Sequence, residues 1–175
     1  MHVNINHSAD TPWVGQLPEQ NACWLATFAM MEHWFYCTTP TTSAASRNAL
    51  RKELKDEDNI EISADIQEGE LRRVAQALGM QVAKPGNAKS LAQKMALSPV
   101  AIFGKYVDWD AGGLIRKHVT LVYKMEGNTA NRTKLFVTGW DPWTAGATPY
   151  TYDWDTFAPG VCSKQDFWVY YQTWS

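Results

Sequence analysis

The sequence predicts an α+β domain, in which helices from the first half of the chain pack against an antiparallel sheet formed by the second half. Apolar residues recur at helical spacing up to residue 97, whereas later segments are rich in β-branched and aromatic residues. Helices followed by strands are typical of this fold class. Because the 175 residues contain no internal repeat or low-complexity linker, we expect one domain that covers residues 1–175.

The first predicted helix starts near Ala22, with Asn21 as its N-cap, and Pro40 forbids its continuation. Steps of four, three and four residues place an apolar face on this helix, formed by Trp24, Phe28, Met31 and Phe35. Residues 1–11, before the helix, are expected to form a flexible N-terminus.

Three further helices are predicted before the strands begin. One covers residues 43–55 with Ser43 as its cap, a second lies within residues 65–79 and ends at Gly79, and a short one covers residues 87–97. The strands are predicted over four later segments with β-branched and aromatic side chains: 99–106, 118–125, 134–141 and 166–174.

Composition and charge argue against binding to nucleic acids or membranes. The net charge is −2, and no apolar run reaches the ~18 residues of a transmembrane helix. The first residues lack the basic and then apolar pattern of a secretory signal. We therefore expect a protein that stays in the cytoplasm of its producer, or that leaves it by a route without a cleaved signal.

The cysteines and histidines predict neither a disulfide framework nor a metal centre. Three cysteines are an odd, small number without C-x-x-C spacing, and the four histidines contain no H-x-x-x-H pair. Phosphate-binding glycine motifs are absent as well, so no metal and no cofactor is expected. Cys37 and Cys162 are expected to be structural, whereas Cys23 has an unusual position.

Cys23 lies in the first turn of the first predicted helix. Backbone N–H groups there lack helical partners and the helix dipole favours negative charge, so both stabilise a nucleophilic thiolate. Such a thiolate needs an imidazole partner. His2 and His7 lie in the N-terminus expected to be flexible, and His33 is about 15 Å away along the same helix. Only His118 begins a strand in the other half of the chain, so it is the predicted partner.

A predicted hairpin supplies a carboxylate for that histidine. If residues 126–133 are its loop, Met125 faces Lys134, and antiparallel pairing places His118 opposite Asp141. Cross-strand neighbours have Cβ atoms about 4.5–5.5 Å apart, so Asp141 could orient the imidazole and support its charge. A register slip of one residue would turn one of the two side chains to the opposite face.

An acyl-transfer site also needs hydrogen-bond donors for a developing oxyanion. The backbone N–H of Cys23 at the helix start is one candidate, and the side-chain amide of Gln16, on the loop before the helix, is the second. Gln20 is a rival to Gln16, but it lies three residues before Cys23 and is expected to point elsewhere.

These segments together resemble bacterial papain-like cysteine proteases. Gln16 precedes "ACW", and "KHVTLVY" and "GWDPW" follow, an order similar to that in bacteriocin leader peptidases and avirulence-effector proteases. The resemblance covers roughly residues 12–170 and implies a papain-like fold. It also implies four roles: Cys23 as nucleophile, His118 as base, Asp141 as orienting acid and Gln16 as oxyanion donor.

The resemblance implies a cysteine peptidase that acts on peptide or protein amide bonds, as a bacterial effector or toxin exported into a target cell by a specialised secretion system. Its implied partners are a peptide or protein substrate and an immunity or inhibitor protein. The same three groups would also serve a peptidoglycan amidase, another amidase, a deamidase or a transglutaminase-like acyltransferase. Because the chain has nine tryptophans, the non-enzymatic alternative is an aromatic-rich binding module, for example for carbohydrate, with an inert cysteine.

Overall fold

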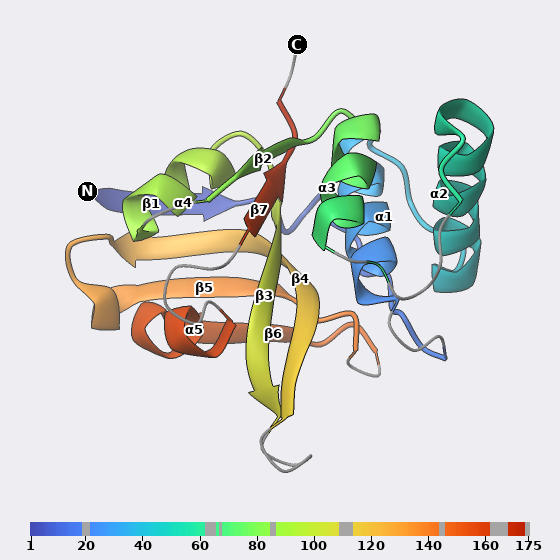
Figure 1. The fold of residues 1–175 in the computed structure, drawn as a ribbon. Coiled ribbons are helices and arrows are strands. Elements are labelled where there is room, and N and C mark those ends of the chain that lie inside the picture. Colours follow the sequence, from blue (N-terminus) through green and yellow to red (C-terminus); the bar gives the residue numbers. More distant parts are fainter. Residues whose placement is uncertain are drawn as a thin grey trace.

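The computed structural model describes residues 1–18, 22–61, 66, 68–84, 87–108, 114–143, 146–161 and 168–173 (Figure 1). Its strands are β1 (His2–Asn6), β2 (Gln81–Ala83), β3 (Val100–Asp108), β4 (Leu114–Asn128), β5 (Leu135–Trp140), β6 (Pro149–Asp153) and β7 (Trp168–Tyr171). They form one seven-stranded sheet in the order β2-β7-β3-β4-β5-β6, with β1 paired to β4. All of these pairings are antiparallel, which confirms the predicted type of sheet.

The described helices are α1 (Cys23–Phe35), α2 (Ser43–Asp58), α3 (Glu68–Ala77), α4 (Ala88–Met95) and α5 (Trp154–Val161), with a 3₁₀ turn η1 (Arg132–Lys134) before β5. The first four follow the sequence prediction, and the α+β class is confirmed. The pair β6 and α5 was not predicted, because residues 149–161 lack a clear period in the sequence. Among the described helices, none has the length and apolarity to span a membrane.

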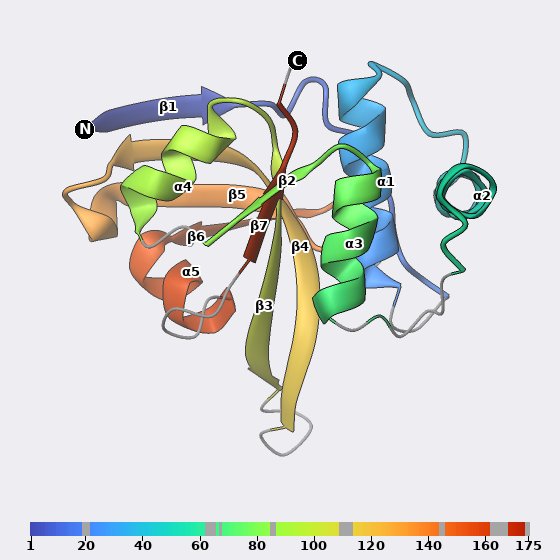
Figure 2. The ribbon, with the colours of Figure 1, turned by 45° about the horizontal axis from the view of Figure 1, so that its top comes forward.

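Helices cover both faces of the sheet. In Figure 2, α1, α2 and α3 lie on one side of β3 and β4, and α4 and α5 lie on the other. Each face of the sheet has its own hydrophobic core, and alternate residues of β3 point into one or the other. Ala101 and Phe103 pack with α1 and α3, whereas Val100 and Ile102 pack with α4 and α5. The fold therefore has three layers, and the sheet is the middle one.

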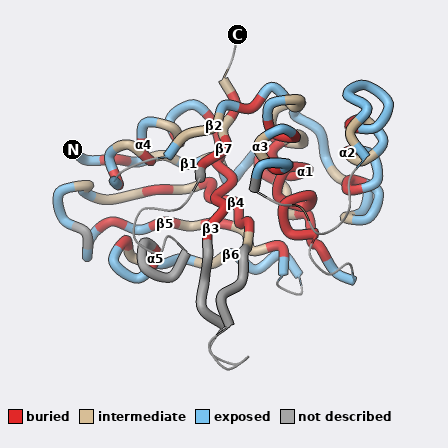
Figure 3. The backbone as a smooth tube through the Cα atoms, in the orientation of Figure 1, coloured by how far each residue is buried: buried red, intermediate tan, exposed pale blue. Residues whose placement is uncertain are grey.

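Helix α1 is buried because it lies between α2 and the strands β3 and β4 (Figure 1). Ten of its thirteen residues are buried, so its apolar surface is wider than the single face that the sequence predicts. Figure 3 shows the contrast with α2, whose outer side is exposed.

The N-cap of α2 is Thr42, whose side chain accepts a hydrogen bond from the Ala45 N–H. The predicted cap, Ser43, does not have this role, because its hydroxyl binds the backbone of Gly15.

The hairpin of β4 and β5 does not have the predicted register. Met125 pairs with Val137 instead of Lys134, because Lys134 belongs to the turn η1 and β4 continues to Asn128. A bulge between Val122 and Lys124 then takes up one residue, so that Leu121 pairs with Trp140 instead of Thr138. At the end of the hairpin that carries His118 and Asp141, the predicted register is therefore wrong by two residues. Because this number is even, each side chain stays on its predicted face of the sheet.

The N-terminal segment also differs from the prediction. Residues 2–6 form β1, which pairs with residues 124–128 of β4, so a flexible N-terminus is wrong for this stretch. Val3 is buried and Ile5 packs on the same core, in the period-two pattern of a half-buried strand. The longer β4 presents an edge there, and β1 covers it.

Candidate active site

Cys23 is the first residue of α1, with Ala22 in the N-cap position, as expected for a residue of the first helical turn. The expected cap Asn21 lies outside the described residues. The Ala26 N–H donates to the Ala22 carbonyl, which fixes the helix from its start. The first turn of a helix directs backbone N–H groups toward its N-terminus, so Cys23 lies where negative charge is favoured. Only 9% of Cys23 is exposed.

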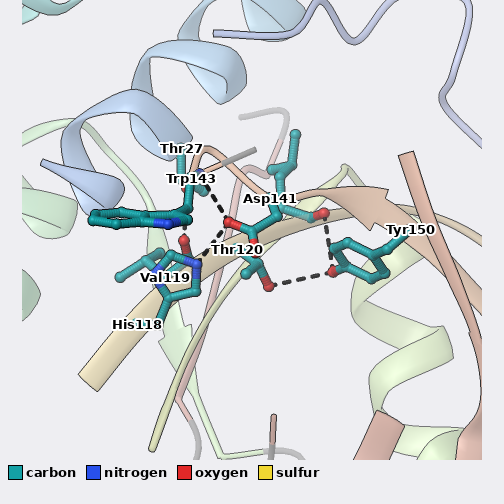
Figure 4. A network of polar contacts seen from close by, with 8 residues as sticks. Thr27, His118, Val119, Thr120, Asp141, Trp143 and Tyr150 are labelled. Atoms are coloured by element: carbon teal, nitrogen blue, oxygen red, sulfur yellow. Dashed lines mark hydrogen bonds and ion pairs between the residues drawn. The ribbon is translucent and has the colours of Figure 1, made fainter. Parts of the chain in front are cut away.

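A buried threonine ties this helix to the strand that carries His118. Thr27 follows Cys23 by one helical turn and therefore lies on the same face of α1. Its hydroxyl donates a hydrogen bond of 3.2 Å to the carbonyl of Val119, the residue after His118 (Figure 4). Thr27 was not singled out from the sequence, although its spacing of four residues from Cys23 is a signal that could have found it.

His118 and Asp141 form a direct contact, with 2.8 Å between His118 Nε2 and Asp141 Oδ1 (Figure 4). They are not directly opposite, because the register of β5 places Asp141 beside Thr120, two residues along β4 from His118. Such diagonal neighbours lie about 7–8 Å apart on one face, with their Cβ atoms somewhat closer, a gap that a ring and a carboxylate can bridge. The same Oδ1 accepts a hydrogen bond of 2.9 Å from the Trp143 N–H.

The electrostatics of the site favour a charged imidazole. Burial lowers the pKa of His118, but hydrogen bonds to Asp141 and Cys23 and the charges of both groups raise it to about 10. Burial raises the pKa of Asp141, but the His118 contact and the Trp143 N–H outweigh it and hold this pKa below its usual value. The side chain of His118 is 16% exposed and that of Asp141 is 32% exposed, so water screens the pair only in part.

Gln16 is buried, with 1% of its surface exposed, on the loop that precedes α1. Its backbone N–H donates a hydrogen bond of 3.0 Å to the carbonyl of Pro142, the residue after Asp141. The loop before the cysteine is thereby joined to the loop that carries the acid. The rival donor Gln20 lies outside the described residues.

The other three histidines have partners elsewhere in the fold. His2 Nδ1 lies 2.7 Å from the Gly127 carbonyl, and His7 Nε2 lies 2.7 Å from the Met95 carbonyl. His33 bridges the hydroxyls of Thr38 and Ser46, at 2.8 Å from each. All three contacts join separate elements, which is a structural role.

The remaining cysteines and acidic groups add no second centre to the part of the chain that the structure describes. Cys37 is a free, exposed thiol, and Cys162 lies outside the described residues. No group of three or more His, Cys, Asp or Glu side chains in the described ranges could hold a metal ion.

The fold is similar to that of a solved bacterial peptidase structure. A solved structure from Bacillus anthracis, described as a C39-like peptidase, is similar with a TM-score of 0.63, although only 14% of residues are identical. The match covers 99% of this chain and 99% of that chain, and at this identity it concerns the fold alone. A search of the curated proteins finds no match.

The family model described as the papain-like cysteine protease AvrRpt2 matches residues 5–155. The chain therefore belongs to this family of hydrolases. The resemblance stated from Gln16, the Cys-Trp pair and the later histidine and aspartate segments is confirmed at the level of family, fold and enzyme class.

Proposed function

We propose that the protein hydrolyses peptide or protein amide bonds with Cys23 as nucleophile, His118 as acid and base, and Asp141 as the group that orients His118. One observation carries this proposal: the Cys23 thiol and the Asp141 carboxylate bind the same imidazole and raise its pKa to about 10. A ring that is protonated at neutral pH favours a thiolate on the sulfur beside it. Membership of a cysteine protease family favours peptide hydrolysis over the other acyl-transfer reactions.

In the first half-reaction, the Cys23 thiolate attacks the carbonyl carbon of the amide, and the electron pair of the C=O bond moves to oxygen. The Gln16 side-chain amide and the Cys23 N–H donate hydrogen bonds to this oxyanion. Since Nε2 of His118 binds Asp141, Nδ1 is the nitrogen that serves the sulfur and gives its proton to the leaving amine. The C–N bond then breaks and a thioester on Cys23 remains.

In the second half-reaction, neutral His118 removes a proton from water, and the resulting hydroxide oxygen attacks the thioester carbon. The C–S bond breaks, the acid product leaves, and the thiolate and imidazolium are restored. Asp141 stays a carboxylate throughout, because its pKa is held below its usual value, and it keeps the ring oriented.

The decisive variant is Cys23→Ala. We expect it to lower hydrolysis of a panel of proteins and peptides by at least about 10³-fold, since the nucleophile is lost. Cys37→Ser is the matched control, because Cys37 is a free thiol exposed on the surface, and it should retain full activity. Activity that survives in Cys23→Ala would rule out the mechanism.

We also propose that the protein acts inside another cell, as an effector or toxin exported from its bacterial producer, with a protein of the target cell as substrate. The resemblance of the Gln16, Cys-Trp, histidine and aspartate segments to avirulence-effector proteases supports this proposal. A reporter fusion followed in mixtures of producer and target cells tests it, and a reporter confined to the producer would contradict it.

A further inference from the structure

Arg47 is a buried charge on a helix that is otherwise largely polar and exposed. Its exposed fraction is 1%, and it lies on the inner side of α2, with Ser46, Leu50 and Leu54. A guanidinium at this depth is unfavourable unless acceptors bind its N–H groups. One such acceptor is the carbonyl of Gly15, to which Arg47 Nη1 donates a hydrogen bond. Gly15 is the residue directly before Gln16.

The backbone of Gly15 is held at its N–H as well as at its carbonyl. Its N–H donates a hydrogen bond of 2.9 Å to the hydroxyl of Ser43, which lies one helical turn before Arg47 on the same face of α2. A side chain at Gly15 would meet the Trp13 indole, with its Cβ 2.5 Å from Cη2. We call Ser43 and Arg47 the Gly15 clamp, because together they bind the N–H and the carbonyl of one residue.

The peptide group that joins Gly15 to Gln16 is thus held at both its carbonyl and its N–H. The Gly15 clamp holds the residue before Gln16, and the Gln16 N–H donates to the Pro142 carbonyl beside Asp141. An oxyanion donor works only when its N–H is placed in advance where the charge will develop. The described contacts therefore run from α2 through Gly15 and Gln16 to the acid of the site.

From these contacts we infer that Arg47 is a positioning residue, which places the Gln16 amide for the oxyanion through Gly15. This inference rests on the proposed function, because it assigns Gln16 the role of oxyanion donor. Arg47 itself does not contact the reacting atoms. Loss of Arg47 should impair steps that form an oxyanion and leave the nucleophile intact.

Two reactions of one sulfur separate these effects without knowledge of the natural substrate. With p-nitrophenyl acetate, Cys23 attacks the ester carbon, an oxyanion forms, p-nitrophenolate leaves and a thioester results. With iodoacetamide, the same sulfur displaces iodide from carbon and no oxyanion forms. Both rates are measured at Cys23 by peptide mass spectrometry, so that labelling of Cys37 does not interfere.

We expect Arg47→Met to lower the rate of acylation by about tenfold or more and to change the rate of alkylation by less than about twofold. Arg47→Lys should restore part of the loss, because lysine keeps one donor but not the planar fork. Ser46→Ala is the control on the same helix, since it removes a buried hydroxyl that binds His33 and should leave both rates unchanged. In the background of Gln16→Ala, Arg47→Met should have no further effect on acylation.

Equal losses in both reactions, or an effect of Arg47→Met that is undiminished in Gln16→Ala, would overturn the inference. Should Arg47→Met fail to fold, Ser43→Ala removes the other half of the clamp and should show the same selective loss of acylation. The proposed function has its own readout, because p-nitrophenolate release that persists in the double variant Cys23→Ala, Cys37→Ser would refute the nucleophile. If wild type and Arg47→Met are acylated at the same rate, even a slow one, the positioning role of Arg47 is refuted, whereas the proposed nucleophile is not.

Discussion

The ring of His118 binds two acidic groups, the Cys23 thiol and the Asp141 carboxylate, and these outweigh the effect of its burial. The histidine is therefore charged over a wider range of pH than a free imidazole, whose pKa is 6.5. This has consequences for both activity and stability at the scale of single residues.

For activity, we expect kcat/KM to fall on the alkaline side with an apparent pKa near 10, where His118 loses the proton that the leaving amine needs. Asp141→Asn removes the carboxylate and should move this limb to lower pH, with a loss of kcat/KM of at least about 10²-fold. A pH–rate profile of both proteins is the measurement. An alkaline limb that does not move in Asp141→Asn would show that the carboxylate does not set the charge of the ring.

For stability, the raised pKa of His118 has a defined sign. The folded state holds the proton more tightly than the unfolded state, so the contribution is complete below about pH 6.5 and is lost as pH rises to about 10. The lowered pKa of Asp141 acts in reverse, and its contribution is complete above pH 3.8 and is lost below it. Both contributions are therefore present between about pH 4 and pH 6.5.

The stability prediction is tested with His118→Gln, which cannot titrate. The free energy of unfolding of the wild type should fall more between pH 6.5 and pH 10 than that of the variant. Urea unfolding at several pH values measures the difference, in which groups common to both proteins cancel. Parallel curves for the two proteins would contradict the shift.

At the scale of elements, the hairpin of β4 and β5 sets the distance between His118 and Asp141. Near the loop, the observed pairing differs from the predicted register by three residues. The bulge between Val122 and Lys124 reduces this difference to two residues at the end near the site. An odd difference would turn Asp141 away from the face of His118, whereas an even difference does not. The bulge is thus the feature of β4 that keeps both side chains together.

Close contact between β4 and β5 predicts the effect of a single methyl group. A Cβ at Gly139 would overlap the Leu121 carbonyl oxygen and the Tyr150 hydroxyl, so Gly139→Ala should force the strands apart two residues before Asp141. We expect a loss of about 2 kcal/mol or more in the free energy of unfolding, together with lower activity.

Gly69→Ala is the matched control for that change. Gly69 lies in α3 with no atom within 4 Å of an added Cβ, so this variant should retain activity and be as stable as wild type or up to about 1 kcal/mol more stable. Thermal unfolding and peptidase assays compare the two variants. Similar results for both would show that the strands tolerate a side chain at Gly139.

At the scale of the whole molecule, the sheet separates two cores, and each core fixes a part of the site. The core with α1 and α3 holds the helix that begins at Cys23, whereas the core with α4 and α5 also contains Val137 of β5 and Val3 of β1. The first residues of the chain thus belong to the same core as the strand that leads to Asp141.

This arrangement predicts that the N-terminal strand contributes to global stability. Val3 is 6% exposed, so Val3→Ala should lower the free energy of unfolding by about 1–3 kcal/mol. Asn4, its exposed neighbour on β1, is the control, and Asn4→Ala should change it by less than about 0.5 kcal/mol. Urea unfolding that shows no effect of Val3→Ala would indicate a detached N-terminus.

Several site residues could be predicted from the sequence because their signals are local. The helix that starts at Cys23 follows from apolar spacing, and His118 follows from the exclusion of three other histidines on the grounds of position. Asp141 was found by a strand-pairing argument whose register was wrong. The error did no harm, because near Asp141 it amounts to two residues and so leaves the side chain on the predicted face. Arg47 was missed, since nothing in the sequence shows which backbone carbonyl a buried donor will meet, whereas Thr27 was missed although its spacing of four residues from Cys23 could have indicated it.

The sequence by itself determined the first four helices and the main strands, because periodicity and residue type act over a few neighbours, and its ordered motifs indicated the family and the three candidate catalytic side chains. Only the tertiary structure decided the bulge in β4, the pairing of β1 and the contact of α2 with the loop before Cys23. These depend on which segments meet after folding, where packing of remote surfaces outweighs local preference. The distance from His118 to Asp141 is of this second kind, since it is set by two strands and not by either one.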